Sequence, residues 1–233
     1  MPGLTQGTQP FQRIDRLVGR WLAVVVVTFG FACAPPAMAA PDSPHLAQHR
    51  EINRKFTEML AADPAAAMKF AKAGVESTKL LGPYDQKRGD ALELLGRAHI
   101  YAEEWKQAMP LTAEVLVIRR AERPAEPEIL SMALINDALV LFGADRQAEA
   151  DAALTEVMAI WRDAFGERDL RRAEKLEQYA MLVQGGFGRT AWVAELLREA
   201  LEVREWHPPD THVAITLYDL AEQELLLQEP GKA

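Results

Sequence analysis

The chain has 233 residues, of which 49% are hydrophobic, enough for one large domain or two small ones with a core. Its formal net charge is −8, from 34 acidic residues against 26 basic ones. This balance argues against nucleic-acid binding, which requires clustered lysine and arginine. A single cysteine excludes an internal disulfide and a zinc or iron–sulfur site built from several cysteines.

Residues 1–39 have the pattern of a secretory signal peptide. A polar segment with three arginines precedes an apolar run from Trp21 to Cys33, and small residues surround Ala39. The run is shorter than the roughly 20 residues that span a membrane. Cleavage after Ala39 is the favoured interpretation, and it predicts an exported protein, in a bacterium a periplasmic one. The alternatives are an uncleaved membrane anchor and a lipoprotein acylated at Cys33.

Cleavage after Ala39 would change the composition of the mature chain. Losing three arginines and one aspartate lowers the formal net charge from −8 to −10. The only cysteine is lost as well, so the mature protein would contain no thiol. Residues 40–45 are then predicted to be a short disordered lead-in to the folded part.

The sequence from residue 46 to residue 228 predicts helices throughout, followed by a tail at 229–233. Apolar residues recur at spacings of three and four, as in Ile52, Phe56 and Met59, and alternating β-branched runs are missing. Prolines stand between the helical stretches or in their first turns. The fold class predicted is therefore all-α.

Within this region a twelve-residue segment occurs three times, at 108–119, 150–161 and 193–204. A weaker copy begins at Ala67. The helix that precedes each segment repeats as well, and alanines mark its equivalent positions: Ala98, Ala138, Ala180 and Ala221. Small residues let two helices approach closely where they cross. The spacing predicts units of two antiparallel helices that bury a continuous core only when they stack.

Turns and linkers divide the repeats in chain order. Short turns within units are predicted at 103–104, 143–145 and 185–188, and linkers between units at 82–85, 123–127, 165–169 and 206–210. The last unit contains only one helix, 217–228. Its three leucines at 225–227 are predicted to pack on the preceding repeat, with a contact between two copies of the chain as the alternative.

These repeats resemble the tetratricopeptide repeat family, in the variant of about 42 residues found in kinesin light chains. The resemblance rests on the segment ending at 200–204 and on the linker at 206–214, and it covers residues 46–228. It implies a right-handed α-solenoid of antiparallel helix pairs. The first unit, 46–82, matches poorly and is interpreted as an atypical cap.

Two charged residues depart from the family pattern. Arg97 and Asp137 occupy a position where the family prefers an apolar residue, and Tyr179 and Leu220 fill it in the later units. One hypothesis is an ion pair between Arg97 and Asp137 on neighbouring first helices. The other is that a small register shift brings both side chains to the surface.

The sequence offers little support for catalysis or metal binding. His45 and His49 stand four residues apart, but no third ligand is near them, so both are interpreted as solvated. The glycine-rich stretch at 185–188 contains no lysine, and it is interpreted as a turn between helices rather than a phosphate-binding loop. We therefore predict no catalytic residues, no metal and no cofactor.

The resemblance implies that the first helix of each unit lines a concave groove. Residues that share the corresponding helix faces are the candidate groove: Leu95, His99, Ile135, Leu139, Phe142, Glu177, Met181 and Gln184. The alternative is that the apolar members belong to the core. If the groove is open, the acidic net charge favours a basic partner.

The function predicted is that of an exported, non-enzymatic scaffold that binds a protein or peptide through this groove. One alternative is an accessory or assembly factor that docks on an envelope enzyme complex. Another is a hydrolase built on the repeats with unrecognised acidic residues. Membrane contact is expected only if the N-terminal segment is retained or Cys33 is lipidated.

Overall fold

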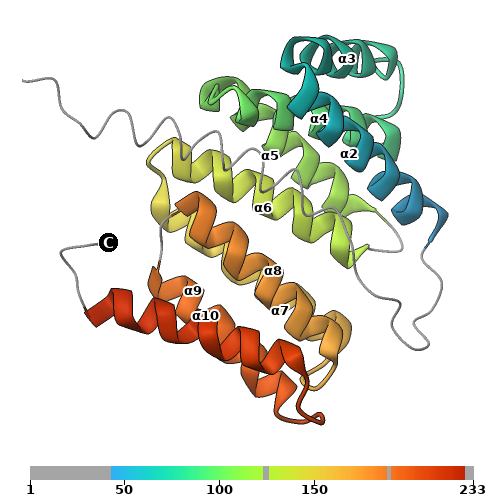
Figure 1. Cartoon of the computed structure of the whole chain (residues 1–233). Coiled ribbons are helices and arrows are strands. Elements are labelled where there is room, and N and C mark those ends of the chain that lie inside the picture. The colour runs from blue at the N-terminus through green and yellow to red at the C-terminus, as the bar shows by residue number, and fades with distance from the viewer. Residues whose placement is uncertain (1–42, 123–125, 188–189, 229–233) are drawn as a thin grey trace, which may run out of the picture.

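The computed structural model describes residues 43–122, 126–187 and 190–228, and every regular element within them is an α-helix (Figure 1). The predicted signal peptide and the tail at 229–233 lie outside the described residues. So do parts of the linker at 123–127 and of the turn at 185–188. The all-α prediction is confirmed for the described part of the chain.

The helices of the described residues follow one another with short connections. Their bounds are α2 Pro44–Ala62, α3 Pro64–Ser77, α4 Gln86–Tyr101, α5 Trp105–Ala121, α6 Pro127–Gly143, α7 Gln147–Phe165, α8 Leu170–Phe187, α9 Thr190–Arg204 and α10 Thr211–Gln228. Three begin with proline, which suits the first helical turn because its nitrogen has no hydrogen to leave unsatisfied.

Polar caps set the helix starts at both ends of the described region. The Ser43 hydroxyl accepts a hydrogen bond from the Leu46 nitrogen at 3.0 Å, so α2 begins before the predicted boundary at residue 46. The Asp210 carboxylate accepts from the Val213 nitrogen at 3.1 Å, and α10 accordingly begins at Thr211, earlier than predicted. The sequence pattern missed both because a cap lies outside the apolar periodicity that it follows.

Two turns within units have the same backbone geometry. Glu103 and Asp145 have φ angles of 56° and 60°, in the left-handed region that ends helices. After each, a backbone nitrogen donates back into the helix, Glu104 to the His99 carbonyl at 2.9 Å and Arg146 to the Leu141 carbonyl at 2.8 Å. The turns after α4 and α6 therefore share one backbone geometry, in keeping with the repeat in the sequence.

The helices pack in adjacent pairs, which is consistent with a helical repeat. The pairs α4–α5, α6–α7 and α8–α9 correspond to the predicted units. Equivalent small residues are buried in each of them: Ala98, Ala138 and Ala180 on the first helices, and Ala108, Ala150 and Val193 on the second. Close approach at these crossings explains why alanine recurs there.

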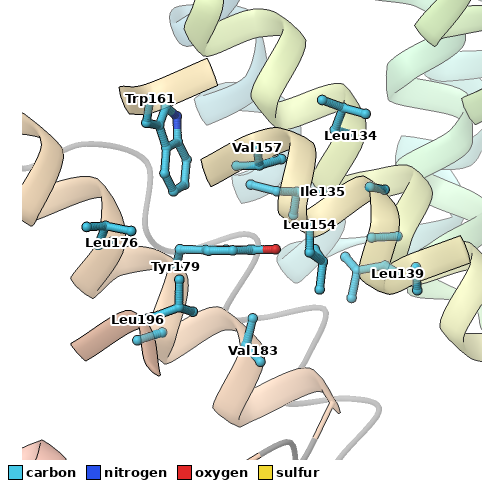
Figure 2. Packing of buried hydrophobic residues seen from close by; sticks show 14 of the residues in the cluster. Leu134, Ile135, Leu139, Leu154, Val157, Trp161, Leu176, Tyr179, Val183 and Leu196 are labelled. Atoms are coloured by element: carbon cyan, nitrogen blue, oxygen red, sulfur yellow. The ribbon is translucent and has the colours of Figure 1, made fainter. Parts of the chain in front are cut away.

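Helices α7 and α8 are less closely packed than the two helices within a pair, and large side chains fill the core between them. The rings of Trp161 on α7 and Tyr179 on α8 meet edge to face, with centroids 5.4 Å apart (Figure 2). Leu176 and Leu196 lie on one side of this pair, and Leu154 lies on the other. The core is therefore continuous between successive units.

Helix α4 is enclosed by its neighbours on all sides. It packs against α2, α3, α5 and α6, and every residue from 91 to 99 is buried. Helix α2 reaches past α4 to α6, where Arg50 donates to Glu128 at 2.8 and 2.6 Å. The first unit therefore closes the N-terminal part of the stack instead of extending it.

Both hypotheses for Arg97 and Asp137 are wrong. Arg97 is buried and donates to the amide oxygen of Asn53 and to the Thr57 hydroxyl, both on α2. Asp137 is half-buried and accepts from the Thr112 hydroxyl at 2.6 Å. The ion pair does not form because α2 and α5 supply nearer partners, and burial keeps Arg97 from the surface.

The prediction for the leucines at 225–227 is also wrong for two of them. Leu225 and Leu227 are exposed, and only Leu226 is half-buried. The face of α10 that packs on the preceding helices carries Thr216, Leu220 and Gln223 instead. The apolar run crosses the boundary between the two faces, which sequence alone did not reveal.

We predict that Gly143→Ala destabilises the protein, although alanine normally favours helices. A Cβ at Gly143 would lie 2.5 Å from Cδ2 of Trp105, so the indole must move. Overpacking of this kind costs about 1–3 kcal/mol. Urea unfolding followed by circular dichroism measures the effect.

The matched control is Gly82→Ala, since nothing lies within 4 Å of a Cβ there. Its free energy of unfolding should stay within about 0.5 kcal/mol of the wild type. Equal stability of the Gly143→Ala and Gly82→Ala proteins would contradict the packing described.

Candidate functional site

The candidate groove residues do not form one continuous open surface. Leu95, Ile135 and Leu139 are buried in the core, Leu95 with the cluster around α2 and α3 and the other two with the larger cluster. Phe142 is half-buried and packs against that larger cluster. These apolar residues serve packing, the alternative that the sequence left open.

The polar members of the candidate groove have separate roles. His99 is buried and its Nδ1 lies 2.6 Å from Oε2 of Glu104, in the turn after α4. Glu177 accepts two hydrogen bonds from Arg204, at 2.6 and 2.7 Å, and one from the Thr216 hydroxyl at 2.5 Å. Glu177 therefore joins α8 to α9 and α10.

Met181 and Gln184 are the two candidates that stay exposed. Both lie on α8, four and seven residues beyond Glu177. The structure thus brings together the three C-terminal candidates on one helix and separates them from the buried ones on α4 and α6. The exposed part of the predicted groove therefore lies on α8.

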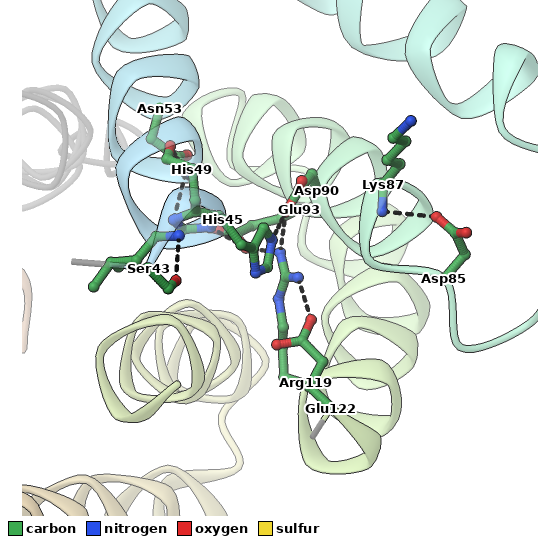
Figure 3. Close-up of polar contacts among 11 residues, drawn as sticks. Ser43, His45, His49, Asn53, Asp85, Lys87, Asp90, Glu93, Arg119 and Glu122 are labelled. Carbon is green, nitrogen blue, oxygen red and sulfur yellow. Dashed lines mark hydrogen bonds and ion pairs between the residues drawn. The ribbon is translucent and has the colours of Figure 1, made fainter. Parts of the chain in front are cut away.

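A buried polar cluster explains why the N-terminal part is closed. We call it the α2–α4 cluster; its members are His45, His49, Asn53, Thr57, Asp90, Glu93, Arg97, Arg119 and Glu122. Figure 3 labels all of them except Thr57 and Arg97. They come from α2, α4 and α5, and Glu122 is the residue that follows the last turn of α5. The cluster attaches α2 to α4 by hydrogen bonds and ion pairs rather than by apolar contact alone.

Arg119 is the cation at the centre of this cluster. Its side chain is fully buried and donates to Asp90 at 2.7 Å, to Glu93 at 3.0 Å and to Glu122 at 2.7 Å. Burial alone would lower the pKa of Arg119, but the neighbouring carboxylates raise it further than burial lowers it. A buried charge is tolerated only when it is paired and hydrogen-bonded in this way.

Glu93 links Arg119 to His49. Its Oε2 atom lies 3.1 Å from Nε2 of His49 and also accepts from Arg119. Burial would raise the pKa of Glu93, but the charges and hydrogen bonds of His49 and Arg119 lower it well below its usual range. Burial would likewise lower the pKa of His49, yet the charge of Glu93 raises it overall.

The interpretation of His45 and His49 as solvated surface residues is wrong. His49 is buried against Glu93, and Nε2 of His45 lies 3.6 Å from Asp90. Both point from α2 toward α4 (Figure 3). In the described part of the chain, no group of three or more histidine, cysteine or acidic side chains is arranged to hold a metal ion.

Helices α8 and α10 carry both acidic side chains and exposed apolar ones. Burial raises the pKa of Asp219, and the charges of Glu222 and Glu177 raise it further. Among the described residues no cation pairs with Asp219. Met181 on α8 and Ile215 on α10 are exposed apolar residues, and Ile215, Asp219 and Glu222 share one helix face.

Sequence reasoning missed the arginines that join α5 to α4 and α9 to α8, although one signal was available. The last residue of the repeated segment is Arg119, Trp161 or Arg204, and all three are buried. Both arginines bind carboxylates on the first helix of their own unit, whereas Trp161 packs on Tyr179. A large residue that recurs at one repeat position marks an inward-facing site.

Comparison with models of known protein families finds no match, and comparison with curated protein sequences finds none either. Within the described residues, no helix combines the length and the apolar character needed to cross a membrane.

We predict that the protein becomes less stable as pH rises above about 6.5, the ordinary pKa of histidine. The pKa of His49 is raised by folding, so its proton stabilises the folded state below that value. The contribution is lost as pH rises through the raised pKa. One proton gives a slope of at most about 1.4 kcal/mol per pH unit.

The measurement is urea unfolding at several pH values for the wild type, His49→Gln and His212→Gln. Glutamine at 49 should flatten the slope, whereas glutamine at the exposed His212 should leave it unchanged. An identical slope in the His49→Gln protein would show that Glu93 and His49 are not coupled.

Proposed function

We propose that the protein is an exported, non-enzymatic helical-repeat scaffold that binds a protein or peptide on a surface formed by residues of α8 and α10. The resemblance of its repeats to the tetratricopeptide family supports the class of ligand. The pattern of residues 1–39 supports export, with the membrane-anchored and lipoprotein forms as alternatives. The binding surface comprises Glu177 and Met181, two residues of the predicted groove, together with Ile215, Asp219 and Glu222 on α10.

The observation that carries this proposal is the grouping of Asp219 with Glu222 and Glu177, where no cation among the described residues pairs with Asp219. Burial raises the pKa of Asp219 most, and the charges of Glu222 and Glu177 raise it further. A cation supplied by a ligand would relieve the repulsion among Asp219, Glu222 and Glu177. The ligand that fits is therefore basic at this point.

Exposed apolar residues next to the acidic group add a second requirement. Met181 lies four residues after Glu177 on α8, and Ile215 lies four residues before Asp219 on α10. Each presents apolar surface beside the carboxylates. A segment with lysine or arginine next to an apolar side chain would engage both, since methionine adapts readily to different shapes.

We predict that peptides selected from a random display library on the wild-type protein are enriched in lysine and arginine next to apolar residues. Asp219→Asn combined with Glu222→Gln should weaken their binding about tenfold, because two ligand charges lose their partners. Fluorescence anisotropy with the selected peptides measures this loss.

The control is Glu195→Gln combined with Glu205→Gln, which removes the same charge from exposed positions elsewhere. It should bind the selected peptides as the wild type does. Selected peptides without basic residues, or equal losses in the two double variants, would refute the proposed surface.

A further inference from the structure

The loop between α3 and α4, residues 78–85, consists of two consecutive turns. In the first turn the Leu81 nitrogen donates to the Thr78 carbonyl at 3.0 Å, and in the second the Asp85 nitrogen donates to the Gly82 carbonyl at 3.1 Å. The chain reverses over the second and third residues of a turn of this kind. The loop therefore has two corners with a defined backbone.

Apolar side chains occupy both corners. Leu80, the third residue of the first turn, is fully exposed, and Tyr84, the third residue of the second turn, is 60% exposed. Turn positions are ordinarily occupied by glycine, proline, asparagine, aspartate or serine. Because these two side chains bury little surface in the folded chain, we look for their role in an interaction outside it.

Another linker of the repeat shows that the fold does not require apolar residues at these corners. Asp85 and Asp169 each begin the first helix of a unit by accepting a hydrogen bond at 2.9 Å from the backbone nitrogen two residues later. Counted back from Asp169 as from Asp85, the two corner positions hold Ala164 and Arg168. The apolar corners are thus a property of the loop between α3 and α4 and not of the repeat.

The same part of the chain is basic, although the protein as a whole is acidic. Four of the eight lysines lie at positions 69, 72, 79 and 87. From residue 64 to residue 88, five basic residues stand against two acidic ones, while the formal net charge of the whole chain is −8. The exposed apolar corners therefore lie within a locally positive region.

Three of these lysines flank the corners. Lys72 and Lys87 are exposed, and neither forms an ion pair within the described residues. Lys79 pairs with Glu76 at 2.5 Å, but both side chains are exposed, so water competes with this contact. The side chain of Lys87 points away from the α2–α4 cluster (Figure 3). All three ammonium groups can therefore meet an anionic ligand.

We propose that this part of the molecule binds the surface of an anionic lipid bilayer. We call it the lipid loop; it comprises Lys72, Lys79, Leu80, Tyr84 and Lys87. The leucine and the tyrosine enter the boundary between headgroups and acyl chains, as the apolar side chains of other interfacial proteins do. The lysines stay in the headgroup layer, where the negative surface potential attracts them.

The chemistry of the lipid loop favours a membrane over an acidic protein. Its cations are lysines, compact charges that suit a diffuse anionic surface, whereas Arg88, whose planar fork suits a single carboxylate, is already bound to Glu114 at 3.0 Å. Leu80 projects as a single aliphatic side chain, which a fluid interface accepts without a matching pocket. Tyrosine is typical of the boundary between membrane and water.

The start of α2 lies on the same side of the molecule as the lipid loop (Figure 1). Nε2 of His45, near the start of α2, lies 3.6 Å from Oδ1 of Asp90, and the lipid loop leads into α4 just before Asp90. The chain therefore enters its described part on the side that carries the lipid loop. In the anchored and lipidated forms named above as alternatives, this attachment would hold the lipid loop near the bilayer.

Membrane binding through the lipid loop is independent of the proposed function, whose ligand surface lies on α8 and α10. Unlike the membrane contact expected from the sequence, it requires neither a retained N-terminal segment nor a lipidated Cys33. A failure of vesicle binding would leave peptide binding untouched. A failure of peptide binding would likewise leave the lipid loop in place.

The first test is cosedimentation with vesicles of protein purified after expression of the full coding sequence. The wild type should bind vesicles of phosphatidylcholine with about 30% phosphatidylglycerol more tightly than vesicles of phosphatidylcholine alone. Lys72→Gln combined with Lys87→Gln should weaken binding about fivefold for each lysine removed. Leu80→Ser combined with Tyr84→Ser should weaken it at least about tenfold.

Each double variant has a matched control. Tyr218→Ser with Leu225→Ser removes the same two residue types from α10, where both are exposed. Lys55→Gln with Lys106→Gln removes two exposed lysines from α2 and α5. Both controls should bind the anionic vesicles within about twofold of the wild type, because distant charges are screened. Circular dichroism checks that all variants are folded.

A wild type that does not bind the anionic vesicles overturns the proposal. Lipid-loop variants that bind them as their controls do overturn it as well. Polyglutamate, a soluble polyanion, tests the acidic-protein alternative. If polyglutamate binds more tightly than the vesicles do, and Leu80→Ser with Tyr84→Ser leaves that binding unchanged, the loop belongs to an acidic protein and the lipid assignment is overturned.

The second test places a reporter at the first corner. A nitrobenzoxadiazole fluorophore is attached to the cysteine of Leu80→Cys in a Cys33→Ser background, and Leu225→Cys labelled in the same way is the control. Anionic vesicles should shift the emission of the label at position 80 to shorter wavelength, because it leaves water, and should leave the label at position 225 unchanged. An unshifted label at position 80 on vesicle-bound protein would contradict insertion of this corner.

Discussion

The burial of α4 on all sides is the constraint on which the rest of the structure depends. Residues 91–99 are all buried, and Glu93, Arg97 and His99 are among them. Charged groups in such a place need partners, because an unpaired buried charge costs several kcal/mol. The partners come from α2, α5 and the turn after α4, so the polar groups of one helix determine where its neighbours dock.

This constraint gives the two ends of the stack different properties. At the N-terminal end, α2 covers α4 through the α2–α4 cluster and reaches α6 through Arg50 and Glu128. At the C-terminal end, the outer face of α10 has no covering helix in the described part of the chain. On α10, the exposed Ile215 lies on the same helix face as Asp219, with which no cation pairs among the described residues, and the proposed ligand surface lies there. Exposed apolar residues also follow α3, among them Leu80 and Tyr84.

Local patterns in the sequence were sufficient to predict the helices and the pairing of neighbours. Apolar periodicity and recurring alanines identify the packed faces, and the turns at 103–104 and 143–145 have matching geometry. The α2–α4 cluster could not be predicted from local sequence patterns, because its contacts join residues about 40 positions apart, such as His49 with Glu93 and Thr57 with Arg97. These contacts depend on how α2 crosses α4, which periodicity does not specify. This crossing helps to bury Leu95 on α4. Met181 lies on the equivalent face of α8, which α2 does not cover, and it stays exposed.

Native-state hydrogen exchange on the Arg119→Met protein tests the central claim most directly. Methionine removes the buried cation and leaves Asp90, Glu93 and Glu122 without it. Because stacked units are stabilised by their nearest neighbours, we expect amides in α2, α4 and α5 to lose protection while those in α8 and α9 keep it. Equal loss in all helices, or unchanged protection in α2, would contradict the account.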